Sequence, residues 1–105
     1  MDGAGVTEAI EVLEHVRRRP SMFLGTPSEQ AVQHFLMGFR TAYQAIGWPI
    51  TLELQCEAFR QRGWEFRADG PAGQMRERSY TEAQVVDELM MIEIAALQLL
   101  LAPPA

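Results

Sequence analysis

Few side chains in this sequence are suited to catalysis or to metal binding. The histidines are His15 and His34, and the single cysteine is Cys56. Zinc sites gather cysteine, histidine and carboxylate ligands at short, regular spacings, and these residues show no such spacing. Ser21 has no histidine and carboxylate placed to activate it as a nucleophile. We therefore predict neither catalytic residues nor a metal site.

Charged and aromatic residues offer better candidates for binding. Arg17, Arg18 and Arg19 follow one another at the end of a predicted helix. Cations there are stabilised by the helix dipole, by about 0.3–1 kcal/mol each, which is the ordinary explanation. The alternative is a patch for a phosphate or an acidic partner. Trp48 and Trp64 are further interaction candidates, because exposed aromatic side chains often anchor interfaces.

Length and composition predict one folded domain over residues 1–105. Hydrophobic residues make up 48% of the chain and charged residues 22%, which is ordinary for a globular protein and unlike a disordered one. The net charge of −5 argues against a nucleic-acid-binding role, which depends on clustered cations. We expect a protein partner or self-association instead.

The sequence also favours a cytoplasmic protein that does not cross a membrane. A single cysteine cannot form an internal disulfide, and residues 1–6 lack the basic and apolar run of a signal peptide. The most apolar stretch, residues 89–102, contains Glu93 and Gln98 and is shorter than the roughly 20 residues that span a bilayer.

The hydrophobic pattern predicts two N-terminal helices. The first begins with Thr7 as its N-cap and stops before Pro20, since a residue that precedes proline avoids helical geometry. The second begins at Thr26-Pro27-Ser28-Glu29, which has the form of a capping box, and ends near Gly47.

After Gly47 the pattern changes to alternation, which is typical of strands. Apolar and polar residues alternate over residues 50–57 and again over 64–67, and together they predict an antiparallel β-hairpin. Residues 74–79 form either a loop or a third strand. The sequence therefore predicts an α+β fold: two helices, a hairpin or three-stranded sheet, and a C-terminal helix.

The C-terminal helix opens with a second capping box, Thr81-Glu82-Ala83-Gln84. It is apolar on nearly every side, and a short chain has difficulty covering such a helix alone. We therefore expect a homodimer through this helix, with Leu97 and Leu100 as contact residues.

Residues 13–25 read Leu-Glu-His-Val-Arg-Arg-Arg-Pro-Ser-Met-Phe-Leu-Gly. This segment resembles the N-terminal peptide of type II topoisomerase ATPase subunits of the gyrase B and topoisomerase IV B type, which typically reads Leu-Glu-x-Val-Arg-x-Arg-Pro-x-Met-Tyr-Ile-Gly. The resemblance implies half of a GHKL ATPase domain, with the predicted hairpin and turn in the family's order. When His34 is aligned with the family's helix, its general base falls on Gly38 and its magnesium ligand on Ala42. Neither residue can perform those roles, so the resemblance implies that ATP hydrolysis is lost.

The family's adenine-binding aspartate aligns with Ala68, or with Asp69 if the register moves by one residue, and Gly70 follows it. The resemblance thus makes Asp69 and Gly70 candidates for binding a nucleotide.

Together these observations predict a non-catalytic GHKL-like protein-interaction module, regulatory or assembly-related, that needs no cofactor. An antitoxin or immunity role belongs to the same class. The alternative is a protein that binds ATP or ADP without hydrolysing it, and an unrelated enzyme activity is a third hypothesis.

Overall fold

Across residues 3–102, which the computed structural model describes, every regular element is a helix. The order is α1 (Gly3–Arg18), α2 (Pro20–Leu24), α3 (Glu29–Ala45), α4 (Leu52–Gln61), α5 (Ala72–Glu77) and α6 (Glu82–Leu101). The α+β class expected from the sequence is therefore wrong. The expected domain ends at residues 1 and 105 lie outside the described residues.

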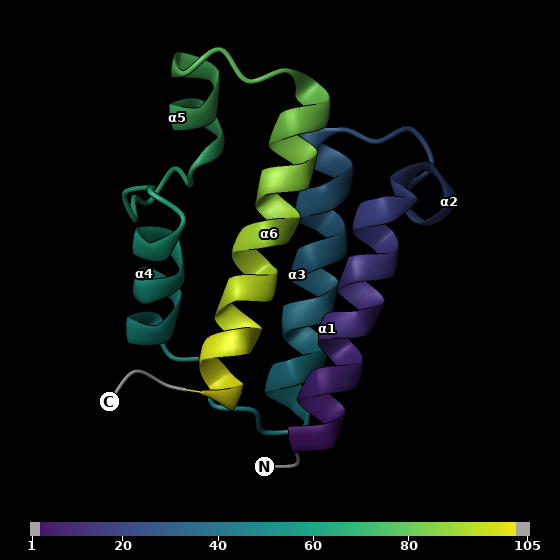
Figure 1. Cartoon of the computed structure of the whole chain (residues 1–105), viewed down its shortest axis with the longest axis vertical. Coiled ribbons are helices and arrows are strands. Elements are labelled where there is room, and N and C mark those ends of the chain that lie inside the picture. Colours follow the sequence, from purple (N-terminus) through teal and green to yellow (C-terminus); the bar gives the residue numbers. More distant parts are fainter. Residues whose placement is uncertain (1–2, 103–105) are drawn as a thin grey trace.

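Helix α6 is the element around which the others assemble (Figure 1). Its start confirms the predicted capping box: the Thr81 hydroxyl accepts from the Gln84 amide at 3.2 Å, and the Gln84 side chain accepts from the Thr81 amide at 2.7 Å. Helices α1, α3, α4 and α5 all pack against α6. This packing buries Leu97 completely and leaves Leu100 only 8% exposed, so the chain covers its most apolar helix itself.

The N-terminal helices are confirmed, but they start at other residues than the sequence indicated. Helix α1 begins before Thr7, whose hydroxyl donates to the Gly3 carbonyl at 3.0 Å instead of capping the helix. Helix α3 is capped by Ser28, whose hydroxyl accepts from the Ala31 amide at 3.1 Å. The chain leaves this helix at Gly47, whose φ of +83° favours glycine.

The first strand of the expected hairpin is instead helix α4. Thr51 caps this helix by accepting from the Leu54 amide at 3.1 Å, and Glu53 lies in the first turn, near the positive end of the dipole. Leu54 and Ala58, four residues apart, pack against α6. Leu52 is 64% exposed, although the alternation predicted that it shares a buried face with Leu54. The residues of this segment that pack on α6 therefore follow the four-residue spacing of a helix and not the two-residue alternation of a strand.

The predictions of a second and a third strand are also wrong. Residues 64–67 form an irregular segment in which Trp64 is buried and Phe66 is exposed, although a strand would place both on one face. The segment expected as a third strand lies mostly in α5. The Gln74 side chain of α5 accepts from the Glu65 amide at 3.0 Å and donates to the Glu65 carbonyl at 2.9 Å. These two hydrogen bonds, and not strand pairing, hold residues 64–67 against α5.

The half GHKL domain implied by the resemblance requires the hairpin. Because residues 3–102 contain no strand, that implied fold is wrong as well.

Candidate functional site

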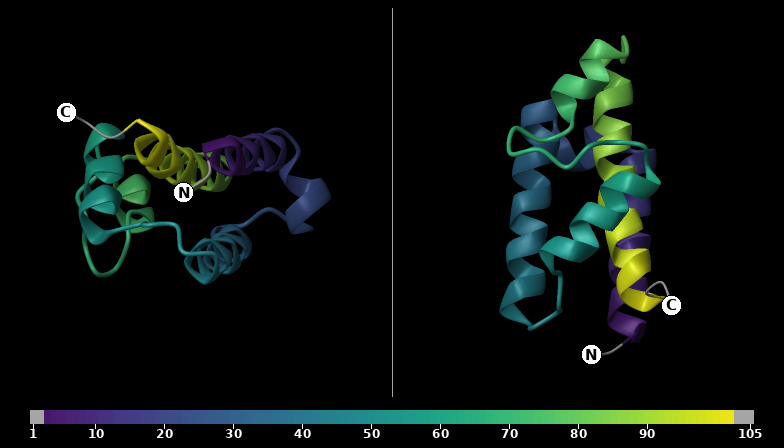
Figure 2. Two further views of the ribbon diagram at one scale, coloured as in Figure 1. Left: turned by 90° about the horizontal axis from the view of Figure 1, so that it is seen from below. Right: turned by 90° about the vertical axis from the view of Figure 1, so that its left-hand side faces the viewer.

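A groove of about 480 Å³ lies between α3 and α4, with α6 as its floor and the segment after α4 along its edge. Figure 2 shows α3 and α4 on separate flanks of α6. The groove's apolar lining includes Leu36, Met37, Ile50, Phe59, Phe66, Leu89 and Ile92. Its polar lining includes Gln33, Arg40, Gln44, Gln55, Arg67, Asp69 and Glu93.

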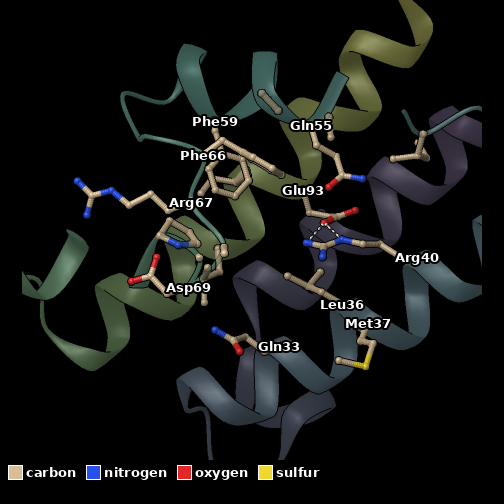
Figure 3. Close-up of a pocket in the computed structure, with 18 of the residues that line it drawn as sticks. Gln33, Leu36, Met37, Arg40, Gln55, Phe59, Phe66, Arg67, Asp69 and Glu93 are labelled. Carbon is tan, nitrogen blue, oxygen red and sulfur yellow. Dashed lines mark hydrogen bonds and ion pairs between the residues drawn. The ribbon is translucent and has the colours of Figure 1, made fainter. Parts of the chain in front are cut away.

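A buried carboxylate, Glu93 of α6, occupies the floor of the groove (Figure 3). Its side chain is only 3% exposed. Arg40 of α3 approaches it with Nε at 2.8 Å and Nη2 at 2.7 Å, and both nitrogens contact the same oxygen, Oε1. Within residues 3–102 the second oxygen, Oε2, accepts no hydrogen bond. The site therefore holds one satisfied and one open acceptor on the same buried carboxylate.

Charged groups at the edge of the groove follow a similar pattern. Arg67 forms an ion pair with Glu65, at 2.6 Å between Nη2 and Oε2, and this pairing raises the pKa of the Arg67 guanidinium. Asp69 is exposed and makes no hydrogen bond or ion pair within the described part of the chain. Both lining arginines are thus occupied by carboxylates, whereas the carboxylates of Asp69 and Glu93 can accept further hydrogen bonds.

The apolar walls include side chains that remain open to solvent. Met37 is 63% exposed and Phe66 is 41% exposed. Phe66 packs edge-to-face on Phe59, with ring centroids 4.9 Å apart. An apolar wall beside a few polar groups is the usual composition of a binding pocket.

Of the site residues expected from the sequence, Asp69 and Gly70 line this groove. The arginine run lies elsewhere, at the end of α1 beside α2, on the opposite flank from α4 (Figure 1). Arg17 contacts Glu14 and Asp87, each at 3.2 Å, while Arg18 and Arg19 are exposed and form no ion pair among residues 3–102.

The other expected interaction residues contribute to packing. Trp64 is buried; its indole Nε1 donates to Glu88 at 3.0 Å, and Arg78 lies 4.2 Å from its ring centre. Trp48 is half-buried and stacks on Tyr43 at 5.0 Å. Leu97 and Leu100 face the core.

Sequence reasoning missed Glu93, Arg40, Met37 and Phe66 as site residues. A usable signal existed for one of them: Glu93 is an isolated acid in an apolar stretch of a predicted buried helix. A buried charge requires a partner, which predicts a basic residue opposite. Nothing local identifies that residue as Arg40.

A scan against protein-family models and searches of curated proteins and of solved structures found no match to this chain. The resemblance of residues 13–25 to the gyrase B peptide stays a prediction. None of the helices among residues 3–102 has the length and apolar character to cross a membrane. The same part of the chain contains no cluster of three histidine, cysteine or acidic side chains that could hold a metal ion.

Proposed function

We propose that this protein is a non-catalytic protein-interaction module with a regulatory or assembly role, and that the groove between α3 and α4 is its binding site. The observation that supports this most is the exposure of Met37 and Phe66 beside the buried carboxylate of Glu93, which pairs with the partly exposed Arg40. Large apolar side chains beside a desolvated polar group are typical of the energetic centre of a protein interface.

A matched pair of variants tests this proposal. Met37→Ser removes an exposed apolar side chain from the groove, and Met22→Ser does the same on α2, where Met22 is 72% exposed. Neither change creates a core cavity. We expect partners captured from the native lysate, measured by quantitative mass spectrometry, to be lost with Met37→Ser, at a cost of about tenfold in affinity, and kept with Met22→Ser. Identical capture by both variants would refute the groove as the binding site.

Binding of ATP or ADP is the alternative function, and it is favoured by one observation. Asp69 and Gly70 line the same groove as Phe66, where an aromatic base finds a flat apolar surface and a carboxylate acceptor. Against it, Arg40 and Arg67 already pair with carboxylates, so phosphates meet no free cation in the groove. Heat released on titration with ADP would favour this alternative.

A further inference from the structure

We propose that the partner of the groove is a basic amphipathic peptide segment. It places an arginine or lysine against Glu93 and an apolar side chain against Met37 and Phe66. This inference rests on the proposed function and specifies the chemistry of the partner.

Two buried acids on α6 show why Glu93 points to a ligand. Glu88 is 7% exposed and has both oxygens occupied: Arg62 donates at 2.7 Å to Oε1 and at 2.9 Å to Oε2, and Trp64 donates at 3.0 Å to Oε2. Glu93 is at least as buried, yet its Oε2 accepts nothing within residues 3–102. Among residues 3–102 the Tyr43 hydroxyl is the only fully buried polar side-chain atom without a partner, so Oε2 of Glu93 keeps contact with solvent and can accept a charge-assisted hydrogen bond from an incoming N–H group.

Figure 3 shows the Glu93 side chain between Gln55 and Arg40, with both dashed lines from Arg40 reaching one oxygen. Glu93 also lines the groove. A donor that enters the groove therefore reaches the free oxygen without displacing Arg40.

The balance of charges indicates that this donor is a cation. Arg40 and Arg67 are each neutralised by a carboxylate, whereas Asp69 has no ion pair in the described part of the chain. An acidic segment would meet arginines whose charge a carboxylate already balances, whereas a basic segment would meet Asp69, which has no ion pair within residues 3–102, and the open oxygen of Glu93. The net charge of −5 further favours encounter with a basic partner.

Size and wall chemistry match an arginine or lysine beside an apolar residue. A volume of about 480 Å³ accommodates a few side chains. The methylene stem of the cation can lie along the apolar lining of the groove while its head reaches Glu93, as long basic side chains do on apolar surfaces. Met37 adapts readily to the shape of an apolar neighbour.

The probes for this inference are N-acetyl-Leu-Arg-amide and its acidic counterpart, N-acetyl-Leu-Glu-amide. Each is titrated into the ¹⁵N-labelled full chain, and backbone amide shifts are followed by NMR. We expect the arginine peptide to bind in the millimolar range and to shift amides along the groove, and the glutamate peptide to bind about tenfold more weakly.

Glu93→Gln tests the role of the carboxylate directly. The glutamine oxygen still accepts from Arg40, and its amide then presents a donor to the groove where Oε2 was an acceptor. Glu53→Gln is the control, because it makes the same charge change at an exposed position of α4 outside the groove. We expect about a tenfold loss of arginine-peptide binding for Glu93→Gln and no change for Glu53→Gln. If Glu93→Gln does not fold, Asp69→Asn, at an exposed position, takes its place and should weaken binding by a smaller factor.

Equal binding of the two peptides, no binding of the arginine peptide, or unchanged binding by Glu93→Gln would overturn the basic-partner inference. These results leave the proposed function standing, since the comparison of Met37→Ser with Met22→Ser judges it separately.

Discussion

Tyr43 is the residue with the least satisfied polar group of the core. Its side chain is buried between Trp48, on which it stacks, and Phe39, which meets its ring edge-on at 5.0 Å. Its hydroxyl has no hydrogen-bond partner within residues 3–102. Burial, followed by the nearby charge of Glu93, raises the pKa of the Tyr43 phenol well above its usual range.

This raised pKa gives the stability of the protein a dependence on alkaline pH. In the unfolded chain Tyr43 ionises near its ordinary pKa of about 10, whereas in the folded chain it stays protonated. The stabilisation is therefore complete below that pKa and is lost as the pH rises above it, because the unfolded state alone loses the proton.

Tyr43→Phe removes this effect. At neutral pH we expect the free energy of unfolding to change by less than about 1 kcal/mol, since the lost hydroxyl had no partner. Above a pH of about 10, urea denaturation should show a smaller loss of stability in the variant than in the wild type. Parallel losses in the two proteins would contradict the assignment.

At the scale of the element, α4 has the fewest buried residues of the four longer helices α1, α3, α4 and α6, because only its Ala58 is buried. Ala58 and the half-buried Leu54 pack on Ala95, Ala96 and Leu99 of α6, and Leu54 and Phe59 also pack on the main core from positions that are only partly buried. The ion pair between Arg62 and Glu88 holds only the C-terminal end of α4. The groove leaves the side of α4 toward α3 without a helical neighbour.

We therefore expect the backbone amides of α4 to exchange hydrogen with solvent faster than those of α6, because local opening follows the amount of buried contact. Hydrogen–deuterium exchange followed by mass spectrometry measures this. A peptide that covers Leu52–Gln61 should reach full exchange well before one that covers the middle of α6. Equal protection of the two helices would show that α4 is held more firmly than its contacts indicate. If the groove is the binding site, a bound arginine peptide should slow exchange in α4.

At the scale of the whole molecule, the other helices of the same chain already bury α6. Self-association through this helix would therefore have to displace them. The expectation of a homodimer rested on too little chain to bury Leu97 and Leu100, and both are buried within one chain. A dimer through these residues requires α6 to lose part of its present packing. We therefore expect a monomer at micromolar concentration in light scattering coupled to gel filtration. A stable dimer would indicate contact through another surface or an exchange of helices.

Local signals account for the parts of the fold that the sequence predicted well. Caps and helical periodicity depend on neighbours a few residues away, which is why the pattern located the helix that ends near Gly47 and the start of α6 at Thr81. The error over residues 50–57 also has a local cause. Alternation suggested a strand, while the N-cap at Thr51 and the spacing of Leu54 and Ala58 carried the helical signal.

By itself, the sequence determined the acidic balance, the long apolar C-terminal helix and the position of an isolated acid, Glu93, within it. Only the tertiary structure decided which residue pairs with Glu93. Arg40 lies 53 positions away in the sequence and reaches Glu93 because α3 packs on α6. It also decided that Asp69, Met37 and Phe66 border one groove. Caps and periodicity arise within a few residues, whereas a groove exists only where helices distant in sequence pack side by side.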